Sequence, residues 1–238
     1  MIASDHIRRI HLGHFTRPPG DEWAGEKIVV VAYVIRHPDG LVLFDTGIGV
    51  GDEEAERIYH PMRRPLDEAL ATAGLRAEDV SMVVNCHLHF DHSGNNFRFP
   101  SVPIFMQRVE SENAREVDYT IPEVVIDFPG AKTELLDGEA EVLPGLRVVP
   151  TPGHTSGHQS LVIQTDRGAV VLAGQAFNAT SEYARAQFAW QLESSGSREP
   201  LTFPDWVRRF QAFDPWRILF AHDVAIWERD ARPGASLR

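Results

Sequence analysis

Four residues of the types that bind metal ions lie within six positions of one another near the middle of the chain: His87, His89, Asp91 and His92. In an extended segment, residues two apart share a face, so His87 and His89 can reach one cation together. Asp91 and His92 lie past a turn and can reach a second cation. Imidazoles and a carboxylate without a thiolate are usual ligands of catalytic zinc, and of iron, manganese or cobalt. Because such metals make hydroxide available at neutral pH, the cluster predicts hydrolytic chemistry.

A polar, His-rich loop at the surface is the alternative interpretation of this cluster. At the His and Asp frequencies of this chain, four such residues at fixed positions arise by chance in about one in a thousand sequences. We therefore interpret the four residues as metal ligands.

The elements that must position the cluster are strands that end in polar loops. Residues 28–35 and 41–44 are joined by a Pro-Asp-Gly turn, which predicts a β-hairpin that ends at Asp45. Residues 82–84 are too few and too β-branched for a helix. They predict a buried strand that leads directly into the His87 loop.

The rest of the chain has the same organisation of strands, turns and short helices. We predict helices over residues 66–73 and 203–213, and strands over residues 146–150, 161–164, 169–172 and 218–220. The first and last of these strands lead into His154 and His222. Because loops at one edge of paired sheets converge in space, these two residues can join the central cluster.

Two motifs carry a family resemblance. The HxHxDH motif of residues 87–92, the TPGHTxGH motif of residues 151–158 and the late His222 resemble the metallo-β-lactamase superfamily. Asp45 matches the early Asp-containing turn of that family. The local sequences HLHFDHSGN and HTSGHQSL are most similar to those of its N-acyl-homoserine lactonase branch. The resemblance extends over residues 29–222.

This resemblance implies an α+β fold, the αβ/βα four-layer sandwich of the metallo-β-lactamase type, in a single hydrolase domain over residues 1–238. It also implies a metal-dependent hydrolase that opens a small lactone, such as an N-acyl-homoserine lactone, by attack of a metal-bound hydroxide. Asp91 would hold the proton of the hydroxide and pass it to the leaving alkoxide.

The resemblance also assigns the metal ligands. His87, His89 and His154 would hold the first metal, and Asp91, His92 and His222 would hold the second. The expected ion is zinc, one or two per chain, with iron, manganese or cobalt as alternatives.

Gln175 departs from the family pattern, because it stands where a bridging Asp belongs. A neutral amide can ligate one metal through its oxygen, but it cannot neutralise two dications as a bridging carboxylate does. We therefore predict either a weakened second metal or a mononuclear site.

A second departure concerns the substrate. Lactonases of this branch have a Tyr three positions after the bridging Asp, and Asn178 stands there in this chain. We predict that Tyr183 replaces it. Residues 177–192 are expected to form an irregular segment whose aromatic side chains either line an apolar pocket or pack onto the core. The early loop with Phe15, Pro18, Pro19 and Trp23 is a further candidate for a pocket wall or a dimer contact.

Several residues near the motifs are predicted to support the site rather than to bind metal. We expect Asp45 to orient a ligand His, His158 to hold a turn, and Cys86 to be a small apolar filler. The remaining histidines that we expect to be solvated are His6, His11, His14 and His60.

Two other functions remain open at this stage. A thioesterase of the glyoxalase II type shares the metal motif, but it usually needs basic residues to hold its anionic tripeptide. The segments that carry the motifs have few basic residues beyond Arg98 and Arg185. A non-catalytic protein that binds a small ligand beside a degenerate second metal site is the other alternative.

Composition limits the remaining possibilities. The 23 basic and 34 acidic residues give a formal net charge of −11, which disfavours nucleic acid as a partner. No run approaches the ~20 apolar residues of a membrane helix. A start without a secretory signal and a single cysteine predict a cytoplasmic protein, which also argues against an exported β-lactamase. We expect a small-molecule substrate, no nucleic acid or membrane partner, and a possible homodimer.

Overall fold

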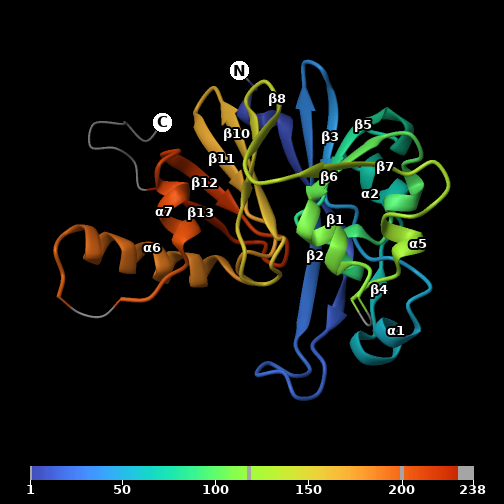
Figure 1. Ribbon diagram of the computed structural model, residues 1–238, viewed down its shortest axis with the longest axis horizontal. Coiled ribbons are helices and arrows are strands. Elements are labelled where there is room, and N and C mark those ends of the chain that lie inside the picture. The colour runs from blue at the N-terminus through green and yellow to red at the C-terminus, as the bar shows by residue number, and fades with distance from the viewer. Residues whose placement is uncertain (1, 117–118, 199–200, 230–238) are drawn as a thin grey trace.

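Two mixed β-sheets lie face to face at the centre of the computed structural model, which describes residues 2–116, 119–198 and 201–229 (Figure 1). Within these residues, the first sheet has the strand order β4-β1-β2-β3-β5-β6-β7 and the second has the order β13-β12-β11-β10-β9-β8. Strands β3, β5, β6 and β7 run parallel, as do β11 and β12, and the other pairs are antiparallel.

The bounds of the strands are β1 (Ile7–Thr16), β2 (Lys27–His37), β3 (Gly40–Phe44), β4 (Met62–Arg63), β5 (Val80–Val84), β6 (Pro103–Gln107), β7 (Lys132–Leu136), β8 (Ala140–Leu143), β9 (Leu146–Pro150), β10 (Gln159–Thr165), β11 (Gly168–Leu172), β12 (Pro215–Leu219) and β13 (Ile226–Glu228).

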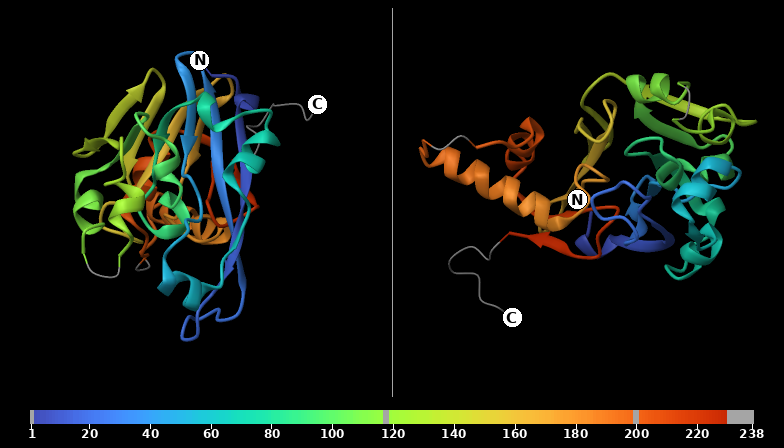
Figure 2. Two further views of the ribbon diagram at one scale, coloured as in Figure 1. Left: turned by 90° about the vertical axis from the view of Figure 1, so that its right-hand side faces the viewer. Right: turned by 90° about the horizontal axis from the view of Figure 1, so that it is seen from below.

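Helices cover the outer faces of both sheets. The first sheet is covered by α2 (Leu66–Ala71), α4 (Arg108–Asn113) and α5 (Pro122–Val125), and the second by α6 (Thr180–Ser194) and α7 (Asp205–Gln211). Two further helices, α1 (Glu53–Tyr59) and α3 (Phe90–Ser93), lie beside the first sheet, and short 3-10 helices span Ser4–His6, Ala77–Asp79 and Asn96–Arg98. Seen from below, the order is helix, sheet, sheet, helix, which confirms the predicted αβ/βα sandwich (Figure 2).

Successive side chains of β2 point to opposite faces of the first sheet, and both faces are apolar. Val31 and Tyr33 pack against the second sheet, whereas Val30 and Ala32 pack against the helices on the outside. Both faces of the strand are buried, so a run of β-branched residues is favoured over an alternation of apolar and polar ones. The apolar contacts between the sheets hold the strand ends of both sheets at a common edge.

Most predicted elements are confirmed, with boundaries that differ by a few residues. The two predicted hairpins are β2–β3 and β10–β11, and the predicted strands before the His87 loop, before His154 and before His222 are β5, β9 and β12. The two predicted helices are α2 and α7.

The prediction of an irregular segment over residues 177–192 is wrong. Residues Thr180–Ser194 form α6, a helix of 15 residues rich in Ala, Glu and Gln, which favour helices. The Glu182 side chain accepts the backbone N–H of Ala179 at 3.2 Å, which satisfies one of the free donors at the helix start. The aromatic residues of this segment lie among these helix-favouring residues rather than in an irregular loop.

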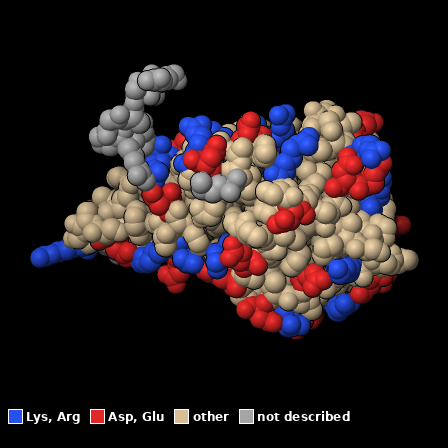
Figure 3. Space-filling model, turned by 90° about the horizontal axis from the view of Figure 1, so that it is seen from above, with Lys and Arg blue, Asp and Glu red and all other residues tan. Residues whose placement is uncertain are grey.

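The charged side chains of the protein are mixed in sign on the face that Figure 3 shows. Acidic and basic side chains lie interspersed over the face shown in Figure 3, so on this face the acidic excess is not gathered into one patch. Among the described residues, no helix combines the length and the apolar character needed to cross a membrane.

Candidate metal centre

Five strand ends deliver the candidate site residues to one edge of the sandwich. Strand β3 ends directly before Asp45, and β5 ends three residues before His87. Strands β9, β11 and β12 are followed by His154, Gln175 and His222. The site is therefore assembled from both sheets.

The first group of candidate ligands consists of three imidazoles, those of His87, His89 and His154. One ring nitrogen from each lies within 4.8 Å of the other two, and Nδ1 of His89 is 3.1 Å from Nε2 of His154. Burial lowers the pKa of His89 to about 4 and that of His154 to about 3. Both imidazoles are therefore neutral at pH 7 and keep a lone pair for a cation.

His87 provides a test of whether a metal ion fits this group. Its Nε2 is buried and has no hydrogen-bond partner among the described residues. Buried polar atoms in proteins are nearly always satisfied, so an unpartnered nitrogen beside two other imidazoles suits a cation as its partner. Three neutral imidazoles with an open position are also the usual donor set of catalytic zinc. The residues present fit a metal ion.

The second group consists of Asp91, His92 and His222, whose ligand atoms also lie within 4.8 Å of one another. The Asp91 Oδ2 is 3.3 Å from Nε2 of His92 and 3.3 Å from Nε2 of His222. Burial alone would raise the pKa of Asp91, but the two imidazoles lower it well below its usual value. The group therefore offers one carboxylate and two imidazoles.

Hydrogen bonds behind the second group select the nitrogen that each imidazole presents. His222 donates from Nδ1 to the Val29 carbonyl at 2.9 Å, and Nδ1 of His92 lies 3.0 Å from the Asp45 carboxylate. Each ring therefore turns its Nε2 toward Asp91. Such outer contacts are typical of metal-binding histidines, because they fix both the tautomer and the orientation of the ring.

Asp45 supports the site as predicted. Its φ of +65° bends the chain out of β3 and aims the carboxylate back at the loop after β5. There Oδ1 accepts the Cys86 N–H at 2.8 Å while Oδ2 contacts His92. The prediction that Asp45 orients a ligand His agrees with this geometry.

His158 holds a turn, as predicted. Cys86 is more than the predicted apolar filler, because its Sγ lies 3.1 Å from Oδ2 of Asp45 and 3.2 Å from Nδ1 of His87. Burial raises the pKa of the Cys86 thiol to about 12, so it stays protonated within the core between the sheets. His158 accepts the Gln175 N–H at Nε2 (3.0 Å), so its proton is on Nδ1, which faces the Thr151 carbonyl at 3.1 Å. This bond holds the backbone of the residue that replaces the bridging Asp.

Gln175 reaches the second group. Its Oε1 lies 3.1 Å from Nε2 of His92, and its Nε2 donates to Oδ1 of Asn178 at 3.0 Å. In this arrangement the amide oxygen of Gln175 faces the candidate ligands, and its NH₂ group faces Asn178. The position thus keeps an oxygen donor but lacks the charge of a carboxylate.

Tyr183 does not reach the site, so its predicted contact with substrate is wrong. The ring is completely buried on α6 against Phe210, Phe220 and Trp227, and its hydroxyl accepts a hydrogen bond from Gln211 at 2.7 Å. The cause is the helix itself, which turns this side chain toward the second sheet.

A cavity of about 850 Å³ opens over both groups, with His89, Asp91, His154 and Gln175 in its lining. Phe15 and Pro18 line it as well, which confirms that the early loop forms a pocket wall. Pro19 and Trp23 are not part of the lining, and Trp23 is half exposed. The predicted solvated residues His6, His11 and His60 are exposed, and His14 is partly buried.

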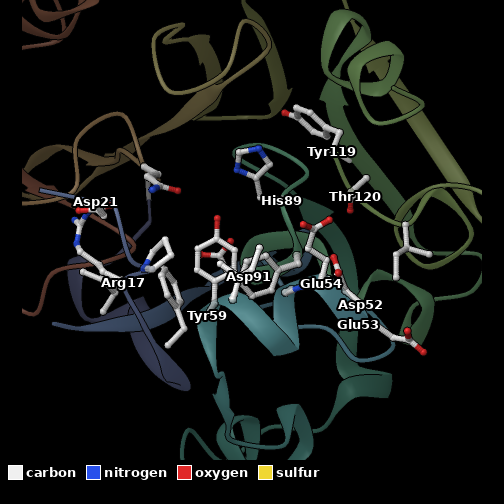
Figure 4. A pocket seen from close by; sticks show the side chains of 18 of the residues that line it. Arg17, Asp21, Asp52, Glu53, Glu54, Tyr59, His89, Asp91, Tyr119 and Thr120 are labelled. Atoms are coloured by element: carbon white, nitrogen blue, oxygen red, sulfur yellow. Dashed lines mark hydrogen bonds and ion pairs between the residues drawn. The ribbon is translucent and has the colours of Figure 1, made fainter. Parts of the chain in front are cut away.

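Two tyrosines that line the cavity escaped the sequence analysis. Tyr59, at the end of α1, packs between Phe15 and Phe90 with ring distances of 5.5 and 5.2 Å. Its hydroxyl end points into the cavity on the side of His89 and Asp91 (Figure 4). Tyr119 packs against His89 with ring centres 4.8 Å apart. No motif surrounds either tyrosine, so sequence spacing carried no signal for them.

The lining of the cavity is acidic away from the candidate ligands. Asp21, Asp52, Glu53 and Glu54 all belong to its lining (Figure 4). Arg17 is the one arginine of the lining among the described residues, and it is paired with Asp21 at 2.9 Å. The protein side of the cavity therefore carries net negative charge outside the metal centre.

Comparisons with known proteins agree with this geometry. Residues 26–222 match the model of the metallo-β-lactamase superfamily. An N-acyl homoserine lactonase from Bacillus cereus is 28% identical over 209 residues, which cover 82% of this chain and 81% of that protein. The N-acyl homoserine lactonase AttM of Rhizobium johnstonii is 31% identical over 163 residues, covering 59% of this chain and 62% of that one.

A solved structure of a quorum-quenching N-acyl homoserine lactone hydrolase superposes with a TM-score of 0.71 at 26% identity, covering 94% of this chain and 93% of the other. Another, with N-hexanoyl-L-homoserine bound at its catalytic metal centre, has a TM-score of 0.73 at 24% identity and covers 94% of each chain. The fold, the two ligand groups and the family match agree: the chain belongs to the metallo-β-lactamase superfamily and is a metal-dependent hydrolase that acts on ester bonds.

Proposed function

We propose that the protein hydrolyses small lactones of the N-acyl-homoserine-lactone class. The observation that carries this proposal is the pair of adjacent ligand groups lining one cavity, in a chain whose curated relatives include N-acyl homoserine lactonases. The residues proposed to hold the first metal are His87, His89 and His154. Those proposed for the second are Asp91, His92 and His222, with the Gln175 oxygen beside them.

We propose zinc as the resident metal, because nitrogen and oxygen donors without a thiolate suit it, with iron, manganese or cobalt as substitutes. When bound, the metal would lower the pKa of a water and polarise the carbonyl of the ester. We further propose that residues 1–238 form a single hydrolase domain and that the protein is a homodimer. We also propose a cytoplasmic location, which suits the free, buried thiol of Cys86.

Asp91 is the proposed proton carrier. It lines the cavity, and His92 and His222 keep it ionised by holding its pKa low against the effect of burial. Its Oδ2 faces these two imidazoles, which leaves Oδ1 as the oxygen that can take a proton. The proton is then delivered to the alkoxide that leaves as the ring opens.

Tyr59 is proposed to contact the substrate in place of the Tyr that the lactonase branch has where this chain has Asn178. Its hydroxyl points into the cavity near Asp91, and among the described residues it has no hydrogen-bond partner. A neutral phenol can donate to the carbonyl oxygen of the ester, which gains negative charge in the transition state.

The acidic side chains of the cavity lining favour a neutral substrate over an anionic one. Glutathione thioesters and β-lactams carry carboxylates, which the Asp52, Glu53 and Glu54 side chains repel. Neither Arg98, which pairs with Asp67 at 2.7 Å, nor Arg185 lines the cavity. These observations weigh against the thioesterase alternative.

A substrate panel tests the proposal. Zinc-loaded protein would be assayed with N-hexanoyl homoserine lactone, S-lactoylglutathione and a chromogenic β-lactam, beside a His89→Ala variant. We expect hydrolysis of the lactone alone, and none by the variant. Faster turnover of the thioester would replace the proposal with a glyoxalase II activity, and saturable lactone binding without turnover would replace it with a binding protein.

A further inference from the structure

Glu110 is a completely buried carboxylate that the proposed reaction does not use. It lies on α4, behind the first group of ligands, with no exposed surface. No Lys, Arg or His within the described ranges forms an ion pair with it. Burying a charge without a counter-ion is costly unless hydrogen bonds compensate for it, so the partners of Glu110 show what it holds in place.

The hydrogen bonds of Glu110 reach both segments that carry the first group. Oε1 accepts the backbone N–H of Leu88, at 2.9 Å, and Leu88 lies between His87 and His89. Oε2 accepts the hydroxyl of Thr155, which follows His154, at 2.8 Å. One carboxylate therefore ties the loop after β5, in the first sheet, to the loop after β9, in the second.

A third bond of Glu110 comes from the cavity wall. The Tyr119 hydroxyl donates to Oε1, and the Tyr119 ring packs against His89. Gly157 lets the His154 loop approach: a Cβ there would lie 2.6 Å from the Glu110 nitrogen and 2.5 Å from its Cβ. The loop thus packs directly onto α4, and only glycine permits that distance.

Charge gives Glu110 a second role. The first group consists of three neutral imidazoles, whereas Asp91 belongs to the second group and Asp45 supports it. Gln175 provides no charge to either group. A dication at the first group therefore has no carboxylate among its proposed ligands, and Glu110 is the buried anion bonded to the segments that carry them.

We propose that Glu110 is a positioning residue for the first metal site, which aligns the His87–His89 segment with His154 and stabilises the bound cation through its charge. Outer partners of this kind typically change metal affinity by about 10- to 100-fold. The proposal concerns metal binding alone, so its test does not depend on whether the substrate is a lactone.

The test is zinc affinity, measured by competition with a chromophoric chelator in two backgrounds. A His222→Ala chain keeps only the first group intact, and a His89→Ala chain keeps only the second. Glu110→Gln preserves the shape of the side chain: its oxygen can accept from Leu88 and its amide can donate to Thr155. The matched control is Glu112→Gln, an exposed change on the same helix.

We expect Glu110→Gln to weaken zinc binding about tenfold or more in the His222→Ala chain and by less than twofold in the His89→Ala chain. Glu112→Gln should change neither. Unchanged affinity at the first group, or an equal loss at both groups, would overturn the proposal. Thermal unfolding of the metal-free chains monitors the fold. If Glu110→Gln does not fold, Thr155→Val, which removes one of the three bonds, must still weaken the first group selectively.

Discussion

In the first ligand group three imidazoles converge, and the buried carboxylate bonded to their segments, Glu110, stands outside the group. In the second group a carboxylate, Asp91, is itself one of the converging side chains, and Asp45 supports His92 from behind. The two groups thus place negative charge differently. Beside the second group, Gln175 offers an oxygen without charge.

This difference has a consequence for the occupancy of the two groups. Two dications a few ångströms apart repel each other, and a bridging carboxylate normally reduces that repulsion. With an amide in its place, the ion that binds first weakens the binding of the second. We therefore expect the two groups to bind zinc with unequal affinity.

The largest effect is expected from removing a ligand of the first group. His89→Ala should lower lactone turnover by about a thousandfold or more, because the site loses the ion that activates water. Circular dichroism should show an unchanged fold. His11→Ala, an exposed change on β1, is the control. Turnover within tenfold of the parent protein would mean that the second group alone supports the reaction.

Tyr59→Phe should lower kcat about 100-fold, because it removes a hydrogen bond to the developing oxyanion and leaves the apolar wall intact. Zinc content should be unchanged, since the hydroxyl does not contact either group. A variant with normal kcat would restrict Tyr59 to packing against Phe15 and Phe90.

Gln175→Asp should tighten the weaker zinc site about tenfold or more, because it restores a negative charge between the ions. Isothermal titration would show the two affinities approaching each other. Gln175→Asn, which keeps a neutral amide, is the matched control and should not tighten the site. Unchanged affinity in Gln175→Asp would place residue 175 outside the space between the metals.

The smallest effect on activity is expected from Tyr183→Phe. The hydroxyl accepts one hydrogen bond from Gln211, so its loss should cost about 1 kcal/mol of unfolding free energy. Turnover should stay within twofold, as judged by steady-state kinetics beside denaturant unfolding. A large loss of activity would mean that the Tyr183 hydroxyl contributes to the reaction after all.

The sequence was most informative where the determinants are local. The hairpins β2–β3 and β10–β11 follow from apolar runs joined by turn residues, and the HxHxDH motif concentrates four candidate ligands in one loop. Gln175 was also located from its distance beyond a predictable strand. In each case neighbouring residues determine the outcome.

The residues that were missed depend on contacts distant in sequence. Glu110 looks no different from Glu112, and only the fold brings it to Leu88, 22 positions away, and to Thr155, 45 positions away. Tyr59 reaches the cavity because α1 packs beside Phe15 and Phe90. Tyr183 was misplaced because the helix that turns it toward the core was not recognised.

The most direct test of the inequality between the two groups is a zinc titration of the unaltered chain, with bound metal counted by elemental mass spectrometry after dialysis. We expect about one zinc per chain to be retained against a moderate chelator, and a second to bind at least tenfold more weakly. Two zinc ions bound with equal affinity would contradict it, because the neutral Gln175 would then impose no penalty on the second ion.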